Sequence, residues 1–230
     1  MNYLLMNNLP AYISIIFIST TLLTIVLFYK AANNSTTVVL ILSGWVILQT
    51  VLGLSGFYIN TTALPPRFIF LAAPALLLIA VIFISSKGKQ FIDGLKIKYL
   101  TILHIVRVPV ELVLFWLFLN KAVPQLMTFE GRNFDIAAGI TAPLVYYFGF
   151  IKNQLSKKII LLWNFICLAL LLNIVINALL SAPTPIQQFA FDQPNIAILY
   201  FPFNLLPAAI VPLVLFSHLA AIRKLLRSHF

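Results

Sequence analysis

Seven stretches of mostly apolar residues recur along the chain, each close to the ~20 residues that a helix needs to cross the hydrocarbon core of a membrane. They cover approximately residues 10–29, 37–58, 67–85, 98–120, 134–151, 158–181 and 195–220. Hydrophobic residues make up 62% of the chain and charged residues only 9%, whereas an ordinary soluble domain carries about 25% charged residues. This composition excludes a soluble enzyme, a soluble nucleic-acid-binding domain and a disordered protein. The sequence therefore predicts an all-α integral membrane protein, a single domain (1–230) built as a bundle of seven transmembrane helices.

The basic residues are distributed unevenly over the two ends of this predicted bundle. If seven helices cross the membrane, eleven of the 15 lysines and arginines share one side with the C-terminus, and three lie on the other side. The eleven are Lys30, Lys87, Lys89, Lys96, Lys98, Lys152, Lys157, Lys158, Arg223, Lys224 and Arg227, and the three are Arg67, Lys121 and Arg132. Because cytoplasmic loops carry the excess of basic residues, we expect an outside N-terminus and a cytoplasmic C-terminus. The protein is then a multi-pass protein integral to the cell (inner or plasma) membrane. Its net charge of +10 reflects topology and contact with the lipid bilayer, and no nucleic-acid partner is expected.

The first three and the last three predicted helices share a few features. A lysine ends the first helix of each half (Lys30 and Lys152), and a tryptophan lies early in the second. These features fit a parallel 3+1+3 repeat joined by the fourth helix, with chance likeness between apolar helices as the alternative. The layout resembles that of the SWEET sugar transporters, which are seven-helix proteins with an outside N-terminus. Their Pro-Gln pairs at the starts of the repeats are missing here, because Pro124-Gln125 follows the fourth helix, so the resemblance is one of architecture alone.

The fourth predicted helix carries three titratable residues, His104, Arg107 and Glu111, within its apolar sequence. At about 100° per residue they share one narrow face, and Arg107 and Glu111 are one turn apart and able to pair directly. Pro109 lies between them and predicts a kink with a freed backbone carbonyl. Charged residues inside a span face the bundle interior and mark a functional site by default. The alternative is a self-neutralising pair that only orders the helix.

Uncharged polar residues occur at compatible depths in three other predicted helices. They are Gln49 in the second helix, Asn173 and Asn177 in the sixth, and Tyr200 and Asn204 in the seventh. If they face inward, they line a cavity that opens to the outside and has Arg107 and Glu111 at its floor. Each of them alone is also explained as a hydrogen-bonding contact between helices.

A short polar segment precedes the fifth predicted helix and would lie at the outer mouth of that cavity. It contains Glu130, Arg132 and Asp135. Asn133 and Asp135 also suit the amino end of a helix, where a cap and an acidic residue satisfy free amides and the helix dipole. Glu130 and Arg132 are otherwise explained as a solvated pair in the loop.

Two histidines, His104 and His218, are placed toward the cytoplasmic ends of the fourth and seventh predicted helices. Two residues of unknown rotation do not define a metal or haem site, and His218 beside a basic tail is more simply an interfacial residue. The single cysteine, Cys167, offers no disulfide and no zinc spacing. We therefore expect neither a metal nor a cofactor.

These observations favour a small-molecule transporter or permease, in which an unidentified substrate lies near Arg107 and Glu111 and Glu111 carries a coupling proton. Prolines inside the helices supply the kinks that alternating access needs. A seven-helix sensor or receptor subunit is the alternative. A membrane-embedded enzyme or a structural subunit fits less well, because the spans contain no nucleophile triad, zinc triad or paired aspartates. The sequence leaves open whether the protein is a homo-oligomer.

Overall fold

The computed structural model describes residue 6, residues 8–61, residue 63 and residues 67–227, and all regular structure in this part is helical. The α-helices are α2 (Ala11–Ala31), α3 (Thr36–Leu54), α4 (Ile69–Ile84), α5 (Ser86–Gly94), α6 (Ile97–Leu103), α7 (Arg107–Leu119), α8 (Ile136–Tyr146), α9 (Lys157–Ser181) and α10 (Val211–Arg227). Short 3-10 turns are η1 (Phe57–Ile59), η2 (His104–Val106), η3 (Gln125–Met127) and η5 (Ala197–Leu199), and two π-helical turns are η4 (Tyr147–Ile151) and η6 (Leu206–Ile210).

Within the described residues, five helical runs are long and apolar enough to cross a membrane. They are α2, α3, the continuous run Ile97–Leu119, α9 and the run Leu206–Arg227. A sixth crossing is present if α4 and α5 are counted as one span bent by 93°. The run Ile136–Ile151 is apolar but shorter than the other spans. The fold is therefore all-helical with five to six candidate spans, and the seventh crossing stays a prediction.

Two helices have other bounds than the hydropathy predicted: one stops earlier and the other begins later. The second helix stops at Leu54, before Gly56 turns the chain with a φ of 73°. The last helix begins at Leu206 and not at residue 195. Residues 195–205 instead form a buried loop, in which the amides of Ile196 and Ala197 bond the Ala122 carbonyl at 3.2 and 3.1 Å. Hydropathy predicts that a segment is buried, but not that it is helical. A loop can be buried as well as a helix can when its backbone amides find hydrogen-bond partners.

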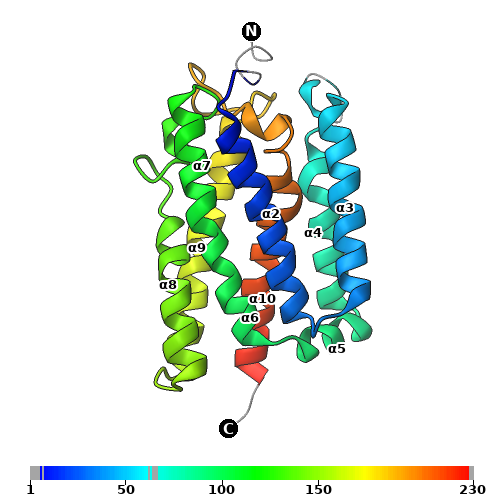
Figure 1. Ribbon diagram of the computed structural model, residues 1–230, viewed down its shortest axis with the longest axis vertical. Coiled ribbons are helices and arrows are strands. Elements are labelled where there is room, and N and C mark those ends of the chain that lie inside the picture. Colours follow the sequence, from blue (N-terminus) through cyan, green and yellow to red (C-terminus); the bar gives the residue numbers. More distant parts are fainter. Residues whose placement is uncertain (1–5, 7, 62, 64–66, 228–230) are drawn as a thin grey trace.

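Helix α10 lies at the centre of the bundle and α3 at its edge (Figure 1). Helices α9, α6 and α4 pack against α10, and α2 packs against α6 and α7. The difference in burial is large: 67% of the run that contains α10 is buried inside the protein, but only 11% of α3. The hairpin of α3 and α4 forms one side of the molecule, and α8 and α9 lie on the other (Figure 1).

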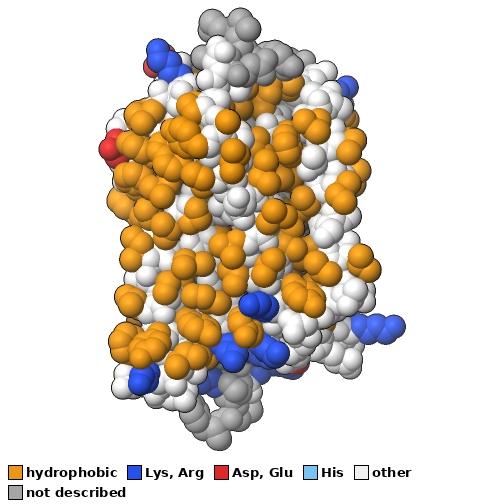
Figure 2. All heavy atoms as spheres, in the orientation of Figure 1, with side chains coloured by type: hydrophobic (Ala, Val, Ile, Leu, Met, Phe, Trp, Pro, Cys, Tyr) orange, Lys and Arg blue, Asp and Glu red, His pale blue; other side chains and the backbone are white. Residues whose placement is uncertain are grey.

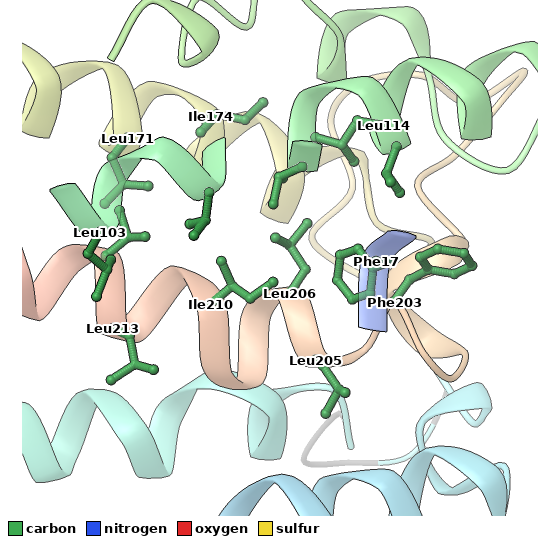
Figure 3. Packing of buried hydrophobic residues seen from close by; sticks show 14 of the residues in the cluster. Phe17, Leu103, Leu114, Leu171, Ile174, Phe203, Leu205, Leu206, Ile210 and Leu213 are labelled. Carbon is green, nitrogen blue, oxygen red and sulfur yellow. The ribbon is translucent and has the colours of Figure 1, made fainter. Parts of the chain in front are cut away.

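The apolar core joins α2, α7, α9 and the last helical run (Figure 3). Phe17 and Phe203 meet there with ring centroids 5.3 Å apart, next to Leu206. Gly139 allows α8 to approach α7 closely, because a Cβ at this position would lie 2.8 Å from Val108 Cγ2. Helices in membranes approach closely where a small residue faces the partner. Gly139 thus brings α8 against the part of α7 that carries Arg107.

The surface shows a broad hydrophobic band, with basic side chains gathered toward the end where α5 lies (Figures 1 and 2). Helix α5 is attached to the end of α10 through Asp93, which pairs with Arg227 at 3.0 Å and Arg223 at 3.5 Å. Lys224 also donates to the Asp93 carbonyl at 2.5 Å. This arrangement is what a bundle surrounded by lipid and bordered by a headgroup layer requires.

Candidate functional site: a buried cluster of charged and polar side chains

The run Ile97–Leu119 changes its helical winding where it carries its polar residues. A 3-10 turn, η2, begins at His104, and α7 resumes at Arg107. Pro109 therefore lies in the first turn of α7, where a missing N–H costs little. His104, Arg107 and Glu111 all turn into the bundle, with exposed fractions of 0%, 2% and 2%. The expectation that they avoid the lipid agrees with this geometry.

Arg107 is held by three elements that are distant in the sequence. Its Nη1 donates to Asp135 Oδ1 at 3.0 Å and to the Cys167 carbonyl at 3.3 Å. Its Nη2 lies 2.9 Å from His218 Nε2. The ion pair thus joins α7 to Asp135, the residue before α8, in place of the one-turn pair with Glu111 that the spacing allowed.

Glu111 is bound by the same loop, through Asn133. The Asn133 amide Nδ2 donates to Glu111 Oε1 at 2.5 Å and to the Met127 carbonyl at 3.0 Å. Asn133 Oδ1 accepts from the Asp135 amide at 3.0 Å. Two residues of one turn in the α7–α8 loop (residues 120–135) therefore bind the two charged side chains. The amide of Asn133 contacts Glu111, and the carboxylate of Asp135 contacts Arg107. Asp135 precedes α8 but makes no side-chain cap bond, so its carboxylate serves Arg107 and not the helix end.

The two histidines face each other, and His218 is not an interfacial residue. Their rings are stacked with centroids 3.8 Å apart and 13° between the planes, and both side chains are fully buried. The indole of Trp163 packs against both rings at 5.6 and 5.9 Å. The interfacial expectation failed because closeness to a basic tail says nothing about the face of the helix on which a residue lies.

The partners of His218 define its protonation state. Asn164 Nδ2 donates to the Ile160 carbonyl, which turns Asn164 Oδ1 toward His218 Nδ1 at 2.9 Å. Because an amide oxygen only accepts, Nδ1 carries a hydrogen, and because a guanidinium only donates, Nε2 accepts from Arg107. His218 is therefore neutral, with its hydrogen on Nδ1.

The cluster carries one positive and two negative formal charges. With His104 and His218 neutral, Arg107, Glu111 and Asp135 sum to −1 when both carboxylates are ionised. A single added proton makes the cluster neutral, which a low-dielectric interior favours. Four buried side-chain atoms of the cluster have no hydrogen-bond partner among the described residues: Glu111 Oε2, Arg107 Nε and both ring nitrogens of His104.

The other predicted polar residues lie elsewhere. Asn204 Nδ2 donates to the Gln49 carbonyl at 2.8 Å, and Gln49 lies on α3, at the edge of the bundle (Figure 1). Tyr200 lies in the loop after η5, not in a helix, and its carbonyl accepts from the Asn204 amide. The structure therefore does not join these three residues to Arg107 and Glu111.

Asn173 binds the backbone of the α7–α8 loop, and Asn177 binds Asn173. Asn173 is exposed and donates to the Arg132 carbonyl at 2.8 Å, and Asn177 donates to the Asn173 carbonyl at 2.9 Å. The Arg132 guanidinium lies over the Phe189 ring at 5.6 Å, and Glu130 is exposed. These contacts do not form the predicted open cavity with Glu111 at its floor. Asn133 and Asp135 instead cover the side chains of Glu111 and Arg107. In this conformation the cluster is closed.

Sequence reasoning did not name Asn164, and it gave Asn133 and His218 other roles, as a helix cap and as an interfacial residue. Asn164 was detectable as an amide inside an apolar helix, which seeks a partner in the bundle. Cys167 contributes only its backbone carbonyl. Among the described residues, no group of three or more His, Cys, Asp or Glu side chains is close enough to hold a metal ion.

Comparison with known proteins gives a family but no activity. No curated protein and no solved structure matches the chain. A family model described as "Domain of unknown function (DUF8737)" matches residues 65–226. This range includes every residue of the buried cluster, helices α4 to α9 and α10 up to residue 226, and leaves out α2 and α3. Since the match covers more than half of the sequence, the chain belongs to the DUF8737 family.

Proposed function

We propose that this protein is a transporter of a small molecule in the cell (inner or plasma) membrane, and that its buried cluster carries the coupling proton. The observation that carries the proposal is the composition of the cluster. Arg107, Glu111 and Asp135 are in one sealed network that is one proton short of neutrality. Buried titratable groups of this kind line proton and substrate pathways in membrane proteins.

A purely structural role explains the cluster less well. Taking charges out of water is costly, and packing between helices is achieved with uncharged residues, such as Trp163 on α9, whose Nε1 donates to Thr141 Oγ1 on α8 at 2.9 Å. A purely structural ion pair would also have all its polar atoms hydrogen-bonded. Here Glu111 Oε2 and Arg107 Nε have no hydrogen-bond partner within the described part of the chain. Glu111 Oε2 is the place where an added proton would be held.

The elements around the cluster are suited to move. Two π-helical turns continue helices that border the cluster: η4 follows α8, which contains Pro143, and η6, with Pro207 at its start, leads into α10, which carries His218. Such turns are common at functional sites. Asp135 and Asn133 hold the closed state. If these two residues released Arg107 and Glu111, the α7–α8 loop could move away and expose both side chains.

The seven-span arrangement belongs to the same proposal. Helix α8 with η4 would make the short crossing, and α4 with α5 the bent one. The basic residues that gather with α5 and the end of α10 would face the cytoplasm, which places the α7–α8 loop outside.

The test uses purified protein in liposomes that contain the pH indicator pyranine. Sugars, amino acids, organic acids and nucleosides are added outside, one class at a time, with the membrane potential clamped by valinomycin and potassium. We expect one class to change the internal pH through the wild-type protein and through Glu130→Gln, the same substitution at an exposed position. Glu111→Gln should abolish the change. If the wild type responds to no class beyond empty liposomes, or if Glu111→Gln retains the wild-type rate, the proposal is wrong.

A further inference from the structure

A second feature lies on the opposite side of the bundle from the charged cluster. A groove of about 230 Å³ runs between α3 and α4 and is open on one side. Its lining is almost entirely apolar: Trp45, Leu48, Gln49, Leu52, Phe57, Phe70 and Pro74. The two helices form one flank of the molecule, and α3 is the least buried of the long helices (Figure 1).

Pro74 and Gln49 explain why the groove has a closed, apolar floor. Pro74 has no N–H, so the Phe70 carbonyl one turn earlier loses its helical donor. Gln49 Nε2 takes the place of that donor at 3.4 Å, and Gln49 Oε1 accepts from the Tyr58 hydroxyl at 2.6 Å. The polar atoms of Gln49 are thus used inside the protein, and the residue is 1% exposed. What remains facing the groove is hydrocarbon and aromatic surface.

The groove ends beside a positive charge. Phe57, one of its lining residues, carries the Arg67 guanidinium over its ring, with Cζ 4.9 Å from the centroid. An apolar cavity of about 150 Å³ is large enough to take benzene, so this groove has room for several carbons of a chain. The combination is an apolar groove with a cation at one end.

We propose that the groove holds an acyl chain of an anionic phospholipid from the surrounding bilayer, with the phosphate of that lipid at Arg67. An arginine binds phosphate through charge-assisted hydrogen bonds, and the lining residues bury the chain. Trp45 is held in place by its own bond from Nε1 to the Ala208 carbonyl at 2.7 Å, so this wall of the groove is anchored to η6. The proposal does not depend on the transport function.

Native mass spectrometry of the protein purified in a mild detergent tests this directly. The protein is titrated with phosphatidylglycerol or with phosphatidylcholine of identical acyl chains, and the species with one bound lipid is measured. We expect the wild type to retain phosphatidylglycerol at about tenfold lower concentration, the factor that one charge-assisted bond provides. Arg67→Gln should bring the two lipids close to equality. Arg132→Gln, at the other arginine over an aromatic ring, should behave as the wild type.

A second pair of variants tests the groove itself. Leu48→Trp places a larger side chain in the groove, so the species with one bound lipid should disappear for both lipids. Leu40→Trp makes the same change at an exposed position of α3 outside the groove and should not. Equal retention of the two lipids by the wild type, or wild-type retention by Leu48→Trp, would overturn the proposal. Thermal unfolding in the same detergent shows that each variant is folded.

Discussion

The Arg107 guanidinium is bound by Asp135, 28 residues further along the chain, at 3.0 Å, although Glu111 lies one turn away on the same helix. The carboxylate of Asp135 is presented by the turn that also places Asn133 on Glu111. The α7–α8 loop therefore binds both charged side chains of α7 and covers them. The proposed opening of the site requires these contacts to break.

Removal of the Asp135 carboxylate should destabilise the protein strongly. Asp135→Ala removes the carboxylate that binds the buried Arg107 guanidinium, and the loss of one partner from a buried pair costs about 3–5 kcal/mol. Asp93 offers a matched control, because its ion pairs with Arg223 and Arg227 are partly exposed. Exposed pairs contribute about 0–1 kcal/mol, so Asp93→Ala should change little. Unfolding in mixed micelles with increasing dodecyl sulfate gives both values, and equal losses for the two variants would contradict the role of Asp135.

The stacked histidines should respond differently to the same substitution. Neither ring nitrogen of His104 has a hydrogen-bond partner among the described residues. Replacing unsatisfied polar atoms by an apolar ring of similar shape is close to neutral or stabilising, which is what we expect for His104→Phe.

His218→Phe removes an acceptor from Arg107 and a donor to Asn164. It should cost on the order of 2–4 kcal/mol, since it leaves two buried groups unsatisfied. The same unfolding titration compares the two variants. A greater loss for His104→Phe would show that the assigned hydrogen bonds of His218 are wrong.

Gly139 should tolerate no side chain. A Cβ there would meet Val108 Cγ2 at 2.8 Å and the Val108 nitrogen at 2.9 Å, so α8 must move away from α7 and draw Asp135 from Arg107. Forcing extra volume into a packed site costs about 1–3 kcal/mol, and we expect Gly139→Ala to lose this amount of stability. At Gly44 a Cβ meets nothing within 4 Å, so Gly44→Ala should gain up to about 1 kcal/mol from helix propensity. A neutral Gly139→Ala would show that α7 and α8 are less closely packed.

The proposed orientation can be tested by labelling single cysteines in intact cells. Cys167 is buried, so the wild type should react poorly with a membrane-impermeant maleimide. In a Cys167→Ser background, Glu130→Cys should be labelled from outside and Lys87→Cys only after the membrane is permeabilised. Both positions are exposed in the structure. Labelling of position 87 in intact cells would reverse the topology.

Much of the local structure follows from the sequence. The length and hydropathy of the apolar stretches gave helices in each of the seven predicted regions, and the angular spacing of His104, Arg107 and Glu111 placed them on one inward face. The sequence did not show that residues 195–205 form a loop, because a buried loop and a buried helix are equally apolar. It also suggested that Gln49 and Asn204 join Arg107, whereas in the structure Asn204 bonds to the Gln49 carbonyl.

The sequence by itself determined that this chain is apolar enough for a membrane, that it is helical, and that Arg107 and Glu111 avoid the lipid. These properties depend on hydropathy and on the period of a single helix, both of which are local. Only the tertiary structure decided that Asp135 and His218 hold Arg107 and that Asn133 holds Glu111. It also decided that the Phe70 carbonyl, which Pro74 leaves without a helical donor, is bound by Gln49. Partners of buried polar groups depend on which helices become neighbours and on their rotation, and no local period in the sequence encodes either of these.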